Sequence, residues 1–182
     1  TNNGGTLSAA SRTITFTGSS SNINGTSGSS FPNIILADGA NYTMSTNNTA
    51  TTLTFEQSST ASGLTHSGSA SLTVSGDVTM NEPSTTATTG WNINAGSASI
   101  SGNFSLGGTN STASFVNQVI VTSVSFSVTG NVTFGSNTTA ANEIISVTTG
   151  ILTFSSPLTL TSGTLRNITS AGTINLNGGL TF

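Results

Sequence analysis

The sequence predicts an all-β protein, a parallel β-solenoid of about seven or eight coils, and three observations lead to this fold class. Apolar residues alternate with small polar residues along most of the chain, which is the period-two pattern of strands. One apolar template recurs five times, at intervals of 22 to 28 residues. No window places apolar residues at the i, i+3, i+4 and i+7 positions that an amphipathic helix needs.

The composition favours an ordered, uncharged β protein. Serine, threonine, asparagine and glycine make up 109 of the 182 residues, a bias that in many chains accompanies disorder. Here, however, 33% of residues are hydrophobic and recur at regular intervals, and only 4% are charged. Disordered chains usually stay solvated through a high net charge, so we expect this chain to fold.

The repeated unit is the template φ-x-φ-x-x-x-φ-x-φ, in which φ is an apolar residue or the small Ala98. A glycine or proline usually stands in its middle, where the chain is expected to bend. The five copies start at Leu72, Ala98, Phe126, Leu152 and Ile174. Their second φ residues, which are expected to line up in one column, are Val74, Ile100, Val128, Phe154 and Leu176.

The N-terminal third repeats less regularly. Four short alternating segments are expected to be equivalent units: Ile14-x-Phe16, Ile34-x-Leu36, Tyr42-x-Met44 and Leu53-x-Phe55. With Phe16, Leu36, Phe55 and Val74 as markers, the spacing is near 20 residues. We therefore expect a single domain over residues 1–182, with irregular coils in 1–63 and regular repeats in 64–182.

Stacking explains why such a unit recurs. One copy places only a few apolar side chains on one face, too few to offset the conformational entropy lost on folding. Stacked copies pair their strands in parallel about 4.8 Å apart and merge these side chains into one continuous core. The alternative fold is an antiparallel β-sandwich or jelly roll of the kind found in filament subunits, because short strands with frequent turns also describe that class.

Three segments, SLTVSGDVTM, SFSVTGNVTF and TINLNGGLTF, resemble the strand repeats of bacterial cell-surface β-solenoids. Such proteins include filamentous-haemagglutinin-like adhesins, autotransporter passenger domains and related secreted right-handed β-helix proteins. The likeness covers roughly residues 64–182 and lies in the style of the repeat, without a diagnostic motif. It implies a parallel β-helix on the outside of a microbe, where many members bind surfaces or sugars and some cleave polysaccharides.

The charges exclude several partners. The chain has no lysine. It contains two arginines, Arg12 and Arg166, and five acidic residues. A net charge of −3 cannot neutralise a run of phosphates, so we expect no nucleic-acid binding. There is neither a polybasic patch nor a run of roughly 20 apolar residues, so we expect no membrane insertion.

Catalytic and metal chemistry lack their usual residues. The carboxylates are scattered singly, and Asp77 and Glu82, the nearest pair in sequence, are interpreted as turn residues. Without cysteine, and with His66 as the one histidine, no typical metal site is expected, and His66 is predicted to lie at the surface or in a turn. We expect no catalytic residue, no cofactor and no metal.

Trp91, in the segment TGWNINAG, has two interpretations. An exposed indole could stack on a sugar ring, whereas its alternation with Ile93 favours a core position. Two asparagines with Asn-x-Ser/Thr signatures, Asn103 and Asn131, follow the glycines in the middle of the template and are interpreted as turn residues. Segments such as LTLTSGT carry the Thr-x-Thr element of ice-binding surfaces, but unequal coil lengths are expected to break such an array.

The expected function is that of a non-enzymatic, secreted structural or adhesive protein at the surface of a bacterium or archaeon, an origin that the lack of cysteine favours. The last unit is expected to form an open coil end at Leu176, Leu180 and Phe182, through which chains assemble head to tail into a homopolymer. The alternative is a carbohydrate-binding or polysaccharide-degrading β-helix, with surface glycans as partners. Ice binding is a third alternative.

Overall fold

The computed structural model describes residues 12–19, 21–23, 29–56, 62–81, 88–107, 116–135, 143–160 and 164–182. These residues form twenty strands and no helix. Every pairing between the strands is parallel. The predicted parallel β-solenoid is therefore confirmed, and the antiparallel sandwich is excluded.

The coil has three faces, each formed by one strand from every turn. The first face contains β7 (Leu72–Val74), β10 (Ala98–Ile100), β13 (Ser125–Val128), β16 (Ile151–Phe154) and β19 (Thr173–Leu176). The second contains β1 (Thr13–Phe16), β8 (Val78–Met80), β11 (Phe104–Leu106), β14 (Val132–Phe134), β17 (Leu158–Thr159) and β20 (Leu180–Thr181). The third contains β2 (Ser21–Ile23), β4 (Asn41–Met44), β6 (Gly63–His66), β9 (Thr88–Ile93), β12 (Val116–Val121), β15 (Glu143–Val147) and β18 (Thr164–Asn167).

Two long strands, β3 (Ser29–Leu36) and β5 (Asn48–Phe55), belong to the first two faces at once. The first part of β5 pairs with β7 and its last part pairs with β8, so the first two faces form one bent 13-stranded sheet. From β6 onward the described chain makes five turns of three separate strands each, fewer than the seven or eight coils predicted. Before β6 the chain passes through β2 and β3 and then β4 and β5, but these are not turns of three separate strands, because β3 and β5 each cover the first two faces.

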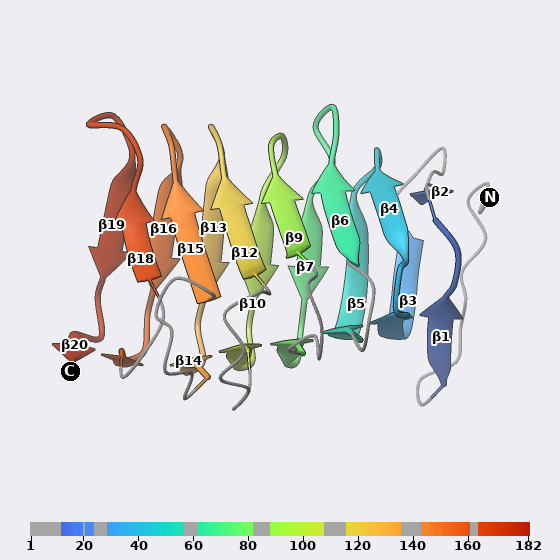
Figure 1. The fold of residues 1–182 in the computed structure, drawn as a ribbon, viewed down its shortest axis with the longest axis horizontal. Coiled ribbons are helices and arrows are strands. Elements are labelled where there is room, and N and C mark those ends of the chain that lie inside the picture. Colours follow the sequence, from blue (N-terminus) through green and yellow to red (C-terminus); the bar gives the residue numbers. More distant parts are fainter. Residues whose placement is uncertain are drawn as a thin grey trace.

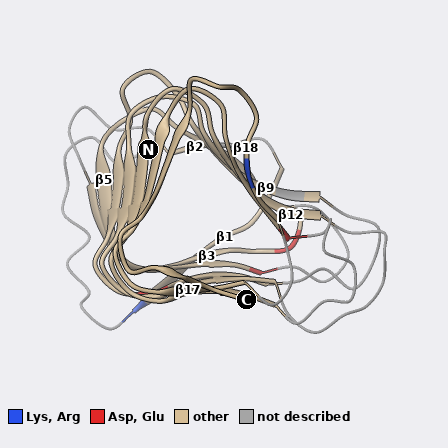
Figure 2. Cartoon of the chain, turned by 90° about the vertical axis from the view of Figure 1, so that its left-hand side faces the viewer, with Lys and Arg blue, Asp and Glu red and all other residues tan. Residues whose placement is uncertain are grey.

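The winding is visible in the figures. In Figure 1 the chain climbs one face through β6, passes over the top and descends through β7 on the far side, while the coils advance from right to left. This sense of winding is right-handed, and the view along the axis in Figure 2 shows a roughly triangular cross-section. Side chains from all three faces therefore meet inside one enclosed core.

The predicted column of apolar residues is confirmed in register. Val74 pairs with Ile100, Ile100 with Val128, and Val128 with Phe154, which pairs with Leu176. The N-terminal alignment is partly wrong. Phe16, Leu36 and Phe55 do form one column, but Phe55 continues to Met80 on the second face, while Val74 pairs with Ala50.

The segment Tyr42-x-Met44 is not equivalent to the other N-terminal segments, because β4 lies on the third face between β2 and β6. The wrong step from Phe55 to Val74 in the predicted column has a physical cause. Two residues separate the paired apolar positions Ala50 and Leu53 in β5, whereas three separate Val74 and Val78 in the next coil. The N-terminal corner is thus one residue shorter than the template.

The corner between the first and second faces is uniform from β7 onward. Three residues connect the two strands in every turn, and backbone bonds run along the axis from Gly102 N–H to the Gly76 carbonyl and from Gly130 N–H to the Gly102 carbonyl, each 3.1 Å. Beside them, Asp77 Oδ1 accepts the N–H of Asn103 at 2.7 Å, and Asn103 Oδ1 accepts that of Asn131 at 3.0 Å. Polar corner side chains thereby satisfy backbone donors that no strand partner reaches.

The variation in repeat length is concentrated at another corner. Seven, nine, eight and four residues separate the second-face strands β8, β11, β14 and β17 from the third-face strands that follow them. The strands nevertheless stay in register, so unequal coil lengths do not break the outward arrays, contrary to the expectation from sequence.

An aromatic cluster fills the central coils. Trp91, which is fully buried, lies with its ring centroid 5.4 Å from that of Phe126, 5.9 Å from Phe55 and 6.4 Å from Phe104. These rings come from strands of all three faces. Burial of such large side chains is the main favourable contribution to folding, so the faces are joined most firmly here.

Candidate functional site

The predicted assembly residues lie at the end of the solenoid and are incompletely covered. Leu176 is half-buried, Leu180 is 40% exposed and Phe182 is 87% exposed. The residues that pair with Leu176 and Leu180 in the preceding coil, Phe154 and Leu158, are fully buried. In the described structure β18, β19 and β20 pair along one side only, so this end presents a strand edge beside apolar side chains.

Trp91 lies in the core, as its alternation indicates, and no sugar can reach it. Its indole Nε1–H donates a hydrogen bond to Nε2 of His66 at 3.0 Å. The buried position of Trp91 therefore excludes the interpretation in which its indole stacks on a sugar ring.

His66 was predicted to lie at the surface or in a turn, and this is wrong, because the side chain is 1% exposed. Met44, its register partner in β4, is also buried, so His66 occupies an inward position of the third face. Since Nε2 accepts from Trp91, the ring is neutral with its proton on Nδ1, which donates to the Ala70 carbonyl at 3.1 Å. Burial lowers the pKa of His66 to about 4 from 6.5, and the Ala70 hydrogen bond opposes this shift.

The acidic residues do not gather into a described cluster. Asp77 is an acceptor in the corner ladder, and Glu143 is buried at the start of β15, while Glu82 lies outside the described residues. Among the residues that the structure describes, no three histidine, aspartate or glutamate side chains lie close enough to hold a metal ion. Because the described chain contains no helix, it also contains none that could span a membrane.

The outward hydroxyl groups do not form a two-column array on the second face. From β8 onward one column carries a hydroxyl group in every coil: Thr79, Ser105, Thr133, Thr159 and Thr181. Its neighbour, at the corner, contains four residue types in five coils and no hydroxyl group: Asp77, Asn103, Asn131, Pro157 and Gly179. An ice-binding array of Thr-x-Thr pairs is therefore missing from this face for a compositional reason.

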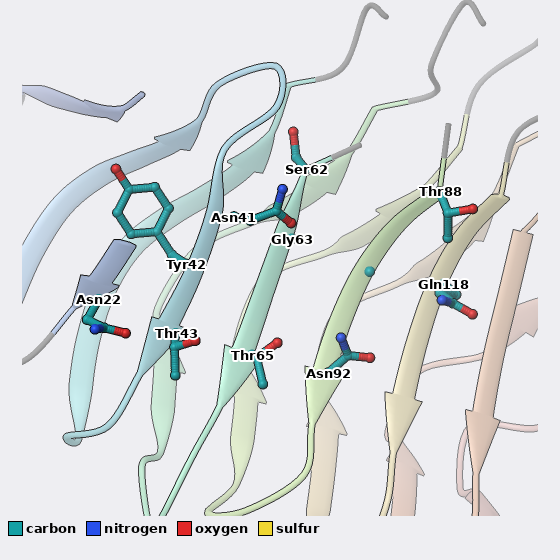
Figure 3. A pocket seen from close by; sticks show the side chains of 11 residues that line it. Asn22, Asn41, Tyr42, Thr43, Ser62, Gly63, Thr65, Thr88, Asn92 and Gln118 are labelled. Carbon is teal, nitrogen blue, oxygen red and sulfur yellow. The ribbon is translucent and has the colours of Figure 1, made fainter. Parts of the chain in front are cut away.

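A polar groove runs across the outer surface of the third face (Figure 3), with a volume of about 360 Å³. Two rows of outward residues line it, each in register from strand to strand. The upper row crosses β4, β6, β9 and β12 at Asn41, Gly63, Gly90 and Gln118. The lower row crosses β2, β4, β6 and β9 at Asn22, Thr43, Thr65 and Asn92.

The two glycines form the floor of this groove. On either side of them stand the amides of Asn41, Asn92 and Gln118, as Figure 3 shows. Among the residues that the structure describes, none that lines the groove carries a charge. The sequence does contain a signal for the groove, which apolar alternation alone does not reveal: Gly63 and Gly90 each occupy an outward strand position immediately before a core residue, Leu64 and Trp91.

The fold defines the class of the protein as a right-handed parallel β-solenoid. In comparisons with known proteins, no protein-family model matches the chain, and no curated protein or solved structure is significantly similar to it.

Proposed function

We propose that the chain is a non-enzymatic structural or adhesive protein of the exterior of a bacterial or archaeal cell, a subunit of a surface filament or a segment of a solenoid adhesin. The chain is nearly uncharged, with two arginines and five acidic residues in 182. An enclosed core with parallel ladders on three faces makes a stiff rod, since each inner coil is bonded to the coils on both sides of it. Such a rod serves to hold surfaces apart or together.

The observation that carries the proposal is the exposed coil end. Leu180 and Phe182 are exposed, Ile174 and Leu176 are partly buried, and β18, β19 and β20 offer backbone groups along their outer side. A further coil placed on this edge would pair its strands and bury these side chains, as the last coil does for Leu158. Because a head-to-tail contact joins two different surfaces of the same chain, such contacts can repeat without closing and generate a fibre.

The test measures assembly directly. Sedimentation and negative-stain electron microscopy of the purified chain over a range of concentrations should reveal linear oligomers. A Leu180→Glu/Phe182→Glu variant should remain monomeric, because it places charge on the apolar end. Ile151→Glu is the matched control, since Ile151 is also exposed, at 45%, but lies on the side of the rod in β16. Monomers at all concentrations, with unprotected amides in β18–β20, would contradict the proposal.

A further inference from the structure

The floor of the third-face groove at Gly90, a buried residue, has no side chain of its own, although the backbone there does not require glycine. At Gly63, by contrast, the Asn41 side chain occupies the place that a Cβ would take. Gly90 has an ordinary negative or extended φ, unlike Gly68 or Gly96. A Cβ built on Gly90 would meet Asn92 Nδ2 at 3.5 Å and nothing closer among the described residues. Glycine inside a strand weakens it and often marks a bulge, a tight bend or a place where a ligand or another backbone approaches closely.

The amide groups beside this floor are available for an external partner. The side chains of Asn92 and Gln118 make no hydrogen bond within the described chain, and neither do the hydroxyls of Thr43 and Thr65. Each of these residues is partly exposed. Their donors and acceptors therefore point into the groove without an internal use.

A second hollow of about 360 Å³ provides an internal comparison. It lies over the first face, and its amide oxygens already accept backbone donors: Asn47 Oδ1 from Ser71 at 2.9 Å and Asn48 Oδ1 from Ser29 at 3.2 Å. Those asparagines hold adjacent coils together. The groove over β4, β6, β9 and β12 has the same size, but the amides of Asn92 and Gln118 do not perform that structural role.

We infer that this groove binds a neutral, hydroxyl-rich oligosaccharide that lies across the strands. Amides and hydroxyls offer both donors and acceptors to sugar hydroxyls, and the lack of a lining cation disfavours phosphorylated or uronic-acid chains. The strand spacing of about 4.8 Å repeats these groups at nearly the length of one hexose unit. The inference goes beyond the proposed function, because the groove lies on the side of the rod and does not depend on stacking at its ends.

The test is a ¹H–¹⁵N NMR titration with three soluble probes: cellohexaose, mannohexaose and, as the charged comparison, hexagalacturonate. At least one neutral probe should shift the side-chain amides of Asn92 and Gln118 and the backbone amides of Gly63 and Gly90, and hexagalacturonate should bind at least tenfold more weakly. The Gly90→Val variant should fill the floor and weaken binding at least tenfold without lowering the melting temperature. Ser127→Val on β13 is the control, since it makes the same kind of outward change on the first face.

A second variant, Asn92→Ala/Gln118→Ala, keeps the backbone unchanged and should also weaken binding at least tenfold. Three outcomes would overturn the inference: no shift with either neutral probe, undiminished binding by both groove variants, or preference for hexagalacturonate. Electron microscopy of the same samples separates this result from the assembly proposal, because the groove variants should still form linear oligomers and Leu180→Glu/Phe182→Glu should still bind the probe.

Discussion

The central coils and the coil of β18–β20 are built from the same repeat, yet they differ in what covers their apolar side chains. In the centre, Trp91, Phe104 and Phe126 are fully buried and contact one another across the coil. In the last coil, Leu176 is half-buried and Leu180 is 40% exposed. The comparison teaches that a coil of this kind gains stability mainly from its contacts with neighbouring coils. The same type of apolar residue therefore contributes less to the free energy of unfolding at an uncovered end than in the centre.

Removal of the central aromatic ring should give the largest effect. Trp91→Ala leaves a cavity among Phe55, Phe104 and Phe126 and removes the donor to His66, so we expect a loss of about 3–5 kcal/mol in the free energy of unfolding. Urea unfolding followed by circular dichroism measures it. Phe182→Ala, at the exposed end, should change stability by less than about 0.5 kcal/mol. Equal losses would break the contrast between centre and end.

A register pair makes the comparison sharper, because the two residues are the same type on the same face. Leu158 is fully buried and pairs with Leu180, which is 40% exposed. Leu158→Ala should cost about 2–4 kcal/mol and Leu180→Ala less than about 1 kcal/mol, measured by denaturation of dilute, monomeric protein. If assembly covers the end, the effect of Leu180→Ala should grow at concentrations where oligomers form.

Acid should weaken the centre through His66. Its pKa is about 4 in the folded protein and 6.5 when unfolded, so between these values the unfolded chain binds more protons. Stability is therefore fully present above pH 6.5 and should fall by about 3 kcal/mol as the pH decreases to about 4. Unfolding at a series of pH values tests this, and His66→Gln should flatten the slope between pH 6.5 and 4. Unchanged pH dependence in that variant would contradict the assignment.

Gly68 and Gly96 both have left-handed backbone conformations but differ in their surroundings, so substitutions at the two positions distinguish the cost of backbone strain from the cost of a steric clash. Gly68 and Gly96 have φ values of 64° and 65°, but a Cβ at Gly68 would meet nothing within 4 Å, whereas one at Gly96 would overlap the Ala70 backbone of the preceding coil. Gly68→Ala should cost about 1 kcal/mol, since only the strain counts. Gly96→Ala should cost at least about 1 kcal/mol more, and similar melting temperatures for the two variants would show that the contact between coils is loose.

The corner ladder should show the smallest effect. Asp77→Ala removes the acceptor for the Asn103 N–H at an exposed corner, which should cost about 1 kcal/mol. Asp77→Asn keeps an acceptor oxygen, as Asn103 itself does in the next coil, and should be nearly neutral. A comparison of the two variants by thermal unfolding tells whether the ladder acts through its hydrogen bond or through charge.

The regular repeats could be predicted from the sequence because one geometric rule, apolar alternation around a three-residue corner, controls residues 72–182. The rule is broken in β3 and β5, where the corner is one residue shorter, and the predicted N-terminal alignment is wrong there. The buried position of His66 could not be predicted from its residue type. The segment Leu64-x-His66 does alternate as a strand does, but burial of the imidazole also needs a hydrogen-bond partner. That partner, Trp91, lies 25 residues away in the sequence. Apolar alternation alone does not predict the groove, because its signal is two outward glycines, Gly63 and Gly90, and the sequence does not show that the fold places them side by side.

The uneven distribution of loop lengths has an evolutionary consequence. Connections of four to nine residues between a second-face strand and the third-face strand after it leave the columns aligned, so we expect this edge of the rod to accept new sequence without loss of the fold. One residue added to the three-residue corner would instead interrupt the backbone ladder that runs from coil to coil there, as from Gly102 N–H to the Gly76 carbonyl. Natural variants and grafted peptides should therefore accumulate along a single edge, where successive coils would display them in a line.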